Sequence, residues 1–359
     1  MNTVTVRLGK RSYPIYIGEG TLNQLGEFAA KKISPGRCAI ITSAPIARHH
    51  LKPAVKSLTS AGFTPIIIEI PDGEQHKNLA TYLAVIDELV KAKLDRTSTL
   101  FALGGGVVGD ITGFAAATYL RGVPYVQIPT TLLAQVDSSV GGKTGVDHPQ
   151  AKNLIGAFNQ PTLVITDTKT LTTLPEREYT SGLAEIIKYG IIASPKLFKH
   201  LETHKKQITQ RNPKTLEHII TESCKIKAHI VAADEKDAGI RQTLNFGHTI
   251  GHAIEAASGY KNIRHGEAVA LGMIAATKIS EDAGLTQTEA ERIKKLIANL
   301  NLPTKTNVNI TKTLTAISHD KKRSDGKTRF IAAQKIGSTC IIENVPKNTI
   351  QKALKSIVK

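Results

Sequence analysis

The fold of this chain is decided by the stretch TLFALGGGVVGD, residues 99–110. Its first five residues are apolar or β-branched, as in a buried strand, and Gly104, Gly106 and Gly109 follow with the spacing Gly-x-Gly-x-x-Gly. Glycines at this place let the backbone approach a pyrophosphate, and the next helix offers its free N–H groups to the same anion. The stretch therefore predicts a strand, a turn and a helix that bind a dinucleotide.

A tight turn without a ligand is the alternative interpretation of these glycines. The acidic residue that usually binds the ribose about 20 positions further on is missing, because residues 124–127 read PYVQ. Another candidate for the ribose is the segment DGEQHK at 72–77, which follows a second apolar run and offers the Glu74 carboxylate.

Short apolar runs recur through the first half of the chain and alternate with helical patterns. Further strands are expected at Cys38–Thr42, Pro65–Ile70, Tyr125–Pro129 and Leu163–Thr166, and residues 1–6 also alternate like a strand. Residues 78–94 predict a helix with one apolar face, formed by Leu79, Leu83, Ile86, Leu89 and Val90. Apolar strands that alternate with helices predict a parallel sheet covered on both faces, with ligands at the carboxyl ends of the strands.

From about residue 175 helical periodicity replaces the strand-like runs. Helices are expected at Pro175–Ile192, Pro213–Ala233, Phe246–Ser258, Glu267–Glu281 and Thr286–Ala298. The fold class that we predict is an α/β N-terminal domain with a parallel Rossmann-like sheet, residues 1–172, followed by an all-α C-terminal domain, residues 173–359.

Histidines gather in this second half. Asn245, His248 and His252 are spaced three and four apart and share one face if they lie on one helix. His265 follows a loop, and Glu185 lies in another apolar helical pattern. Two imidazoles and a carboxylate leave open positions on a zinc ion, and spacing alone pairs His248 with His252. The alternative, ordinary hydrogen-bonding side chains, does not account for so dense a cluster.

The composition limits the possible partners. The formal net charge is +17, but the basic residues are spread and form no dense block, which favours a solvated basic surface over a nucleic-acid footprint. Aromatic residues make up 4% of the chain, too few for base stacking. The three cysteines are dispersed, and we find no export signal and no apolar run of membrane-spanning length. These features predict a cytoplasmic protein without a membrane partner.

Taken together, the motifs resemble the 3-dehydroquinate synthase family, which is related to iron-type alcohol dehydrogenases and glycerol dehydrogenase. The matching segments are 72–77, 104–110, 129–131, 137–147, 152–156, 183–190, 244–252 and 265–267. The most specific of them is DSSVGGKTGVD at 137–147.

The resemblance implies a reaction that spacing does not show. The substrate is the anionic sugar phosphate 3-deoxy-D-arabino-heptulosonate 7-phosphate. It is oxidised at C5 by NAD, loses phosphate, is reduced again by the same cofactor, opens its ring and closes by an aldol step to 3-dehydroquinate. The family works in the shikimate pathway of aromatic amino acid biosynthesis, and its members imply a homodimer with Zn²⁺ or Co²⁺.

The resemblance also implies roles for individual residues. Glu185, His248 and His265 match the zinc ligands, which turns His252 into a substrate contact. The substrate contacts are Arg121, Lys143, Asn153, Lys188, Lys227, Arg241, Asn245, His252 and one of Lys321 or Lys322, of which we take Lys322. The NAD positions are Asp72, Gly73, Glu74, Gln75, His76, Lys77, Gly106, Val107, Val108, Gly109, Asp110, Thr130, Thr131, Lys143, Lys152, Thr170, Leu171, Thr172 and Thr173.

Two features depart from the family pattern. The chain reads Thr42-Ser43 where relatives often place an acid for the adenosine ribose. The large basic excess has no explanation in the family chemistry.

Three rival functions remain. A sister sugar-phosphate cyclase, such as 2-deoxy-scyllo-inosose synthase, would differ where the substrate carboxylate binds, at Lys227, Arg241, Asn245 and His252. A polyol dehydrogenase would accumulate NADH. A basic binding module without catalysis would leave the metal ligands without a purpose.

Overall fold

A computed structural model describes residues 1–359 apart from 260–262 and 324–328, and apart from the side chains of 319–328. The described chain forms two compact units. The first contains Met1–Pro175 and Leu216–Lys236, and the second contains Glu176–Thr215 and Asp237–Lys359. Each unit is treated separately below.

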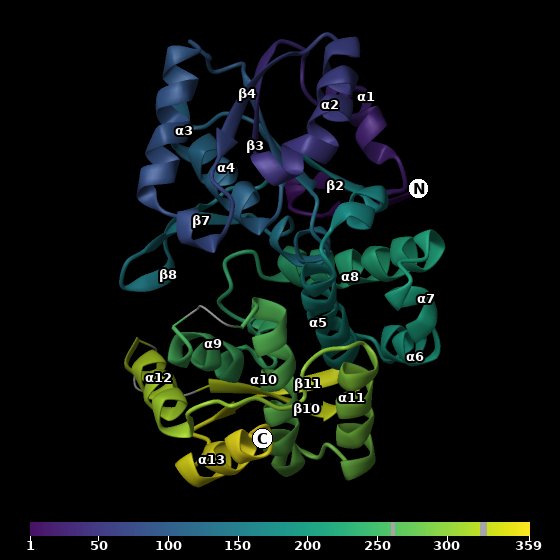
Figure 1. Ribbon diagram of the computed structural model, residues 1–359, viewed down its shortest axis with the longest axis vertical. Helices are drawn as coiled ribbons and strands as arrows, with labels where there is room; N and C mark the ends of the chain where they lie inside the picture. Colours follow the sequence, from purple (N-terminus) through teal and green to yellow (C-terminus); the bar gives the residue numbers. More distant parts are fainter. Residues whose placement is uncertain (260–262, 324–328) are drawn as a thin grey trace. The chain divides into compact units, whose positions relative to one another are not determined.

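In the described part of the first unit, seven strands form one sheet in the order β1-β2-β9-β6-β5-β3-β4. Figure 1 labels β2, β3 and β4 of this sheet. The strands are β1 (Asn2–Val6), β2 (Tyr13–Gly18), β3 (Arg37–Ser43), β4 (Thr64–Ile70), β5 (Thr99–Gly104), β6 (Tyr125–Pro129) and β9 (Leu163–Asp167). Only the β1–β2 pair among them is antiparallel. The predicted parallel sheet is therefore confirmed, and the strand expected from residues 99–103 lies near its centre.

Helices cover both faces of the sheet. Along β3, Cys38 and Ile40 pack with helices α1 (Leu25–Ala30) and α2 (Ala44–Ser60). The alternate residues, Ala39 and Ile41, pack with helices α3 (Leu79–Lys91) and α4 (Gly106–Thr118). Because successive side chains of a strand point to opposite faces, one apolar run supplies both cores, which is why these strands read as continuous apolar sequence.

The apolar face that we expected on α3 is only partly right, because Ile86 and Leu89 pack in the core and the other three residues do not. Leu79, Leu83 and Val90 are 41%, 55% and 59% exposed, while Val85 and Leu89 are fully buried. The helix carries two apolar stripes at helical spacing, and periodicity cannot tell which one faces the sheet.

A further hairpin packs on α4 and escaped the sequence interpretation. Strands β7 (Lys143–His148) and β8 (Ala151–Phe158) pair in antiparallel fashion next to a π-helical turn at Ala134–Ser138. Strand β7 holds residues 143–147 of the family-specific stretch at 137–147. Small and charged residues dominate this stretch, so its pairing is invisible to hydrophobic periodicity.

The second unit is mainly helical, as predicted. Its helices are α5 (Glu176–Ala193), α6 (Pro195–Thr203), α7 (Lys205–Thr209), α9 (His248–Ala257), α10 (His265–Ser280), α11 (Gln287–Asn299), α12 (Ile310–Arg323) and α13 (Lys347–Lys355). Helix α8 (Pro213–Ala233) has the predicted bounds, and most of it belongs to the first unit. Among the described residues, none of these helices is both long and apolar enough to cross a membrane.

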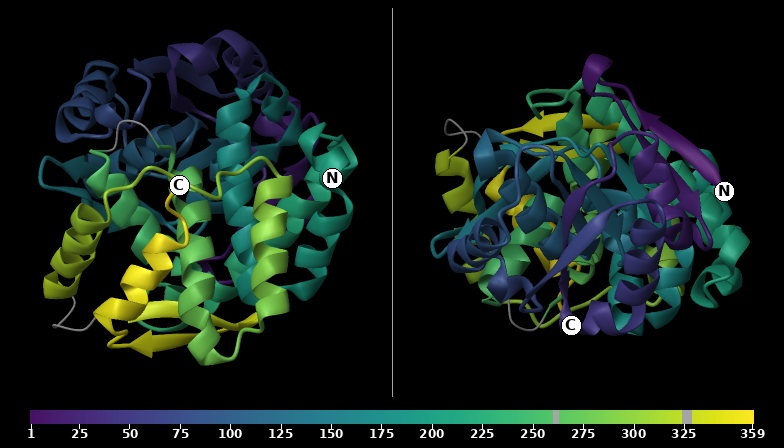
Figure 2. Two further views of the ribbon diagram at one scale, coloured as in Figure 1. Left: turned by 60° about the horizontal axis from the view of Figure 1, so that its bottom comes forward. Right: turned by 90° about the horizontal axis from the view of Figure 1, so that it is seen from above.

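The expectation of an all-α second half needs one correction. Strands β10 (Arg329–Lys335) and β11 (Ser338–Glu343) form an antiparallel hairpin against α10 (Figure 2). The buried run of β10 spans only Phe330–Ala333. So short an apolar run does not distinguish a strand from a helix, and the partner strand decides its structure.

Two glycines set the distances between the helices of this unit. A Cβ atom on Gly266, in the first turn of α10, would lie 1.9 Å from the carbonyl oxygen of Ser181 on α5. A Cβ atom on Gly272 would lie 2.0 Å from the carbonyl oxygen of Gly247, directly before α9. Helices α5, α9 and α10 therefore approach closely only because these positions have no side chain.

Replacing Gly266 by Ala should destabilise the protein, because backbone atoms of two helices must move apart to admit the methyl group. We expect a loss of about 1–3 kcal/mol, the usual cost of overpacking, seen as a lower midpoint of thermal unfolding. Gly36→Ala is the matched control, since a Cβ there meets nothing within 4 Å. Equal midpoints for Gly266→Ala and the wild type would contradict the close approach.

The three cysteines are free thiols in different surroundings. Cys38 and Cys224 are buried, and burial raises the pKa of each thiol to about 12, whereas Cys340 is partly exposed. At pH 8 an aromatic disulfide reagent should therefore titrate one thiol rapidly in the native protein and three after denaturation, because the thiolate is the reacting form. Cys340→Ser should abolish the rapid phase, and its survival would show that a buried thiol reacts instead.

Candidate functional site

The first candidate site lies at the carboxyl edge of the parallel strands. The chain passes from β3 to β4 on one side of the sheet and from β5 through β6 to β9 on the other, so the topology reverses between β3 and β5. Ligands of open α/β sheets bind at such a reversal, outside the carboxyl ends of the strands. Ser43 ends β3 and Gly104 ends β5, which places the glycine loop at this point.

Most residues that the resemblance implies for NAD come from four segments at this edge, whereas Lys143 and Lys152 lie on the β7–β8 hairpin. Asp72–Lys77 follows β4, Gly106–Asp110 begins α4 after β5, and Thr130–Thr131 follows β6. The 3-10 turn Thr168–Thr173 follows β9. One geometric rule, the shared edge of parallel strands, thus gathers segments that are up to 100 residues apart in sequence.

The start of α4 fits a bound pyrophosphate. Gly105 precedes the helix, and among the described residues no side chain caps its first turn. Free N–H groups and the positive end of the helix dipole are available there for an anion.

The buried Lys77 contacts several charged and polar side chains at this edge. Lys77 Nζ lies 2.5 Å from Asp110 Oδ2 and donates to Asn153 Oδ1 at 2.5 Å. Burial alone would lower the pKa of Lys77, but the carboxylates of Asp110 and Glu74 outweigh this effect and raise it. Lys152 Nζ lies 3.6 Å from Glu74, so these five predicted site residues form one cluster at the β8 strand.

Asn153 occupies a special place in this cluster. Its φ of 54° lies in the left-handed region that asparagine tolerates, and its backbone N–H donates to Asp147 at 2.6 Å. The backbone of the β7–β8 hairpin therefore departs from regular strand geometry at Asn153, which is one of the predicted substrate contacts.

The other predicted substrate contacts of this unit differ in their burial. Lys227 on α8 is buried and contacts Asp137 Oδ1 at 2.6 Å. Lys143 is exposed at the start of β7. Arg121 is exposed just past the end of α4, about 20 Å from Gly106 by the length of that helix, so within this unit the structure does not bring it to the glycine loop.

The second candidate site centres on Glu185, which is fully buried on α5. Nε2 of His248 lies 3.3 Å from its Oε1, and Nε2 of His265 lies 3.6 Å from the same atom. Lys188, one turn further along α5, forms a close ion pair with Oε2. Burial alone would raise the pKa of Glu185, but Lys188 and His248 outweigh burial and lower it well below the usual range.

Both histidines turn the same ring nitrogen toward Glu185. Nδ1 of His248 lies 3.3 Å from the carbonyl oxygen of Phe246, and Nδ1 of His265 lies 3.4 Å from Glu255 Oε2. Burial alone would lower the pKa of His265, but the two carboxylates outweigh it and raise the pKa to about 10. Burial, followed by the charge of Lys188, lowers the pKa of His248.

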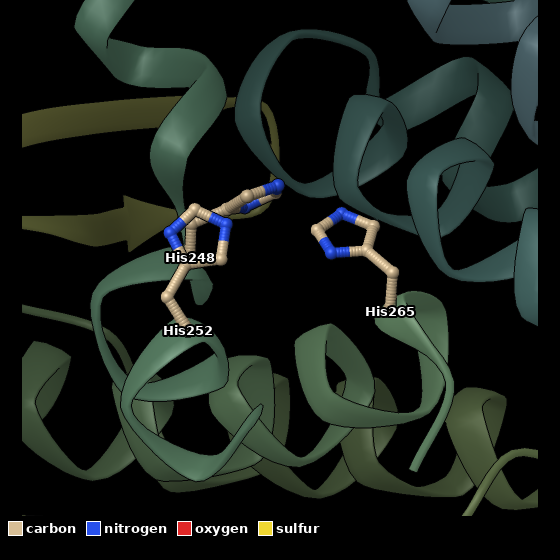
Figure 3. Close-up of side chains that lie close together, drawn as sticks. All are labelled: His248, His252 and His265. Atoms are coloured by element: carbon tan, nitrogen blue, oxygen red, sulfur yellow. The ribbon is translucent and has the colours of Figure 1, made fainter. Parts of the chain in front are cut away.

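A divalent metal ion fits this donor set. Both Glu185 oxygens are buried, and among the described residues neither accepts a hydrogen bond of regular geometry. The imidazoles of His248, His252 and His265 converge from α9 and α10 (Figure 3), with one nitrogen from each within 4.8 Å of the others. A buried carboxylate beside imidazole nitrogens is typical of zinc and cobalt sites.

Neither ligand assignment made from the sequence is decided by this geometry. His248 belongs to both sets, His252 is the exposed member of the cluster, and His265 is partly buried. The set of Glu185, His248 and His265 and the pairing of His248 with His252 both stay predictions.

The condition for a shared face of Asn245 and the two histidines is not met. Asn245 ends a 3-10 turn, and Gly247, at φ 80°, separates that turn from α9. Asn245 is exposed, and Arg241 in the same turn is buried. The side chains of Lys321 and Lys322 lie outside the described residues.

Sequence reasoning missed Glu255. It follows His252 by three residues and His248 by seven, which is the spacing of one helical face, and this was the available signal.

Comparisons with known proteins identify the family of this chain. Residues 67–181 match the 3-dehydroquinate synthase N-terminal family, and residues 182–323 match the 3-dehydroquinate synthase C-terminal family. The 3-dehydroquinate synthase of Geobacter metallireducens is 47% identical over 345 residues, 95% of this chain and 96% of that protein.

Solved structures show the same fold. A 2-epi-5-epi-valiolone synthase from Streptomyces hygroscopicus, with NAD⁺ and Zn²⁺ bound, superposes with a TM-score of 0.90 at 27% identity and covers 98% of each chain. A 2-deoxy-scyllo-inosose synthase complexed with carbaglucose-6-phosphate, NAD⁺ and Co²⁺ superposes with a TM-score of 0.88 at 24% identity, over 98% of this chain and 99% of that chain. The matched regions, the near-complete coverage and the curated relatives together show that this chain belongs to the 3-dehydroquinate synthase family.

Proposed function

We propose that this protein converts 3-deoxy-D-arabino-heptulosonate 7-phosphate to 3-dehydroquinate and phosphate, as an NAD- and metal-dependent phosphorus–oxygen lyase of the shikimate pathway. The observation that carries the proposal is 47% identity to a curated 3-dehydroquinate synthase over 95% of the chain. The sister cyclase with bound NAD⁺ and Zn²⁺ is only 27% identical to this chain, so its reaction is the second candidate function.

Each unit contributes one part of the proposed chemistry. NAD supplies a reversible hydride acceptor, and a Zn²⁺ or Co²⁺ ion polarises the substrate hydroxyl that is oxidised. Residues 1–172 form the NAD-binding domain, and residues 173–359 form the metal- and substrate-binding domain. Most of helix α8, including Lys227, belongs to the first compact unit although it lies in the second sequence range. Glu185, His248 and His265 hold the metal ion, because they combine one fully buried carboxylate with two oriented imidazoles.

Cationic side chains prepare the site for a substrate with a carboxylate and a phosphate. Lys188 and Lys227 are buried and fixed by Glu185 and Asp137, so their charges are positioned before the substrate arrives. Arg241 is buried as well and offers a planar fork for the substrate carboxylate. Fixed donors of this kind stabilise negative charge that develops during phosphate elimination.

The assembly and location follow from the same reasoning. We propose a homodimer, because Arg121 lies at the far end of α4 from the glycine loop, where it is available to a second copy of the chain. We propose a cytoplasmic location, since all three cysteines are free thiols. A small anionic sugar phosphate, and not a nucleic acid or a membrane, is the proposed partner.

NAD should act catalytically, because each turnover oxidises and then reduces the same substrate. The purified chain with NAD, Zn²⁺ and excess heptulosonate phosphate should release stoichiometric phosphate without a lasting rise in absorbance at the NADH band. Stoichiometric NADH would instead identify a polyol dehydrogenase. Turnover of sedoheptulose 7-phosphate in preference to the heptulosonate would identify a sister cyclase.

The two histidines of α9 should differ in their effect on metal content. His248→Ala removes a ligand and should abolish metal retention, whereas His252→Ala should keep the metal and lose most of the turnover. Metal analysis after gel filtration, together with phosphate release, separates these results. Loss of metal from His252→Ala alone would support the pairing inferred from spacing and would refute the assignment carried over from the family.

Arg241 should be required for efficient turnover of a carboxylate-bearing substrate. A charge-assisted bidentate contact contributes about 1.5–3 kcal/mol, so Arg241→Ala should lower kcat/KM at least about tenfold. Arg241→Lys should not restore it, because a point charge cannot reproduce the fork. Arg292→Ala, on an arginine that pairs with Glu202 on another face of the unit, is the control. Wild-type efficiency in both Arg241 variants would remove this residue from the substrate site.

A further inference from the structure

Glu255 is a buried carboxylate that the proposed chemistry does not use. It lies on α9 with 4% of its surface exposed, and its Oε2 atom lies 3.4 Å from Nδ1 of His265 on α10. Burying a carboxylate is costly unless it is paired and hydrogen-bonded. Its placement against one nitrogen of a proposed metal ligand therefore calls for a functional reason.

The contact decides which nitrogen of His265 faces the metal position. A neutral imidazole has one donor nitrogen and one acceptor nitrogen. If Nδ1–H donates to Glu255, the lone pair is on Nε2, and this is the atom that lies 3.6 Å from Glu185 Oε1. The hydrogen bond thus fixes both the tautomer and the direction of the ring.

His248 provides an internal comparison. Its Nδ1 lies 3.3 Å from the carbonyl oxygen of Phe246, and its Nε2 also faces Glu185. The two rings have the same orientation, but a backbone acceptor orients His248 and a side chain orients His265. Only the second acceptor can be removed by substitution, and only the second carries a negative charge.

The helices hold the pair in place. His248, His252 and Glu255 follow one face of α9, and the ring of His265 comes from the first turn of α10. The two helices meet at Gly272, where any side chain would collide with the backbone before α9. The distance between Glu255 and His265 is consequently set by the packing of two helices.

We propose that Glu255 is a positioning residue for the metal site, which orients His265 through Nδ1 and strengthens the binding of a divalent cation by Nε2. The inference deepens the proposed function and rests on its metal site. Partner groups of metal-ligating histidines contribute about 10- to 100-fold to metal affinity. Because Glu255 is proposed to act through His265, its effect should appear first in metal binding.

The test measures zinc affinity of the full chain after chelator treatment, by competition with a zinc-binding dye. Glu255→Ala should weaken zinc binding by up to about 100-fold, and Glu255→Gln by about tenfold, because its amide oxygen still accepts from Nδ1–H. Glu281→Gln is the matched control, since this carboxylate is exposed and pairs with Lys278. It should bind zinc as the wild type does.

Two further measurements distinguish positioning from general stability. The visible absorption bands of the Co²⁺ protein should shift in Glu255→Gln, because the geometry of the ligand changes. In a His265→Ala background, Glu255→Gln should cause no additional loss of zinc affinity, because its effect acts through that ring. The thermal midpoint of the metal-free Glu255→Gln protein shows that this isosteric variant is folded.

The outcomes separate the two proposals. Wild-type zinc affinity in both Glu255 variants, or an equal loss from Glu255→Gln with and without His265, would overturn the inference while the proposed metal site stands. If the wild-type chain binds no zinc at this site, the metal part of the proposed function fails, and the inference fails with it.

Discussion

The burial of Glu185 is the constraint on which the second unit depends. A carboxylate without solvent costs several kcal/mol unless opposite charges and hydrogen-bond donors surround it. Lys188 comes from the same helix, and His248 and His265 come from two others, so three helices must meet within one side-chain length. Glycine at 266 and 272 allows them to do so. Glu185, whose burial is costly, is thus also the group around which the helices of this unit pack. Ionisable groups perturbed in this way are common at functional sites.

In the first unit, the geometry of the parallel sheet determines where the candidate site lies. A parallel sheet brings the carboxyl ends of its strands to one edge, and every loop that leaves this edge can contribute to one site. Segments that are distant in sequence therefore lie at the same edge of the sheet. They contain Asp72, Gly106, Thr131 and Thr170. The ion pair of Lys77 with Asp110 then ties helix α4 to the loop after β4.

The sequence was sufficient where a pattern repeats and insufficient where pairing is non-local. The strand at Tyr125–Pro129 and the helix at Pro213–Ala233 have their predicted bounds, because continuous apolar runs and a long 3.6-residue period are strong signals. The β7–β8 hairpin was missed, since its order comes from pairing and from the contact of Asp147 with Lys77. The face of α3 was only partly right, because two stripes fit the same period. The residues that gather around Glu185 were named from the motif, but the break at Gly247 and the ring orientations depend on backbone geometry that no spacing rule contains.

The distribution of charge explains why the basic excess says little about the site. Among the residues whose side chains the structure describes, the lysines at 5% exposure or less are Lys77, Lys188 and Lys227. Each pairs with a carboxylate: Asp110, Glu185 and Asp137, respectively. The cations closest to the proposed chemistry are therefore neutralised locally, as the cost of burying an unpaired charge requires. The surplus of +17 must then reside mainly on solvated side chains, where salt screens it over about 10 Å at 0.1 M ionic strength. A bound substrate phosphate or carboxylate would meet lysines whose positions are already fixed by acidic partners, so recognition depends on those local pairs and not on the net charge of the chain.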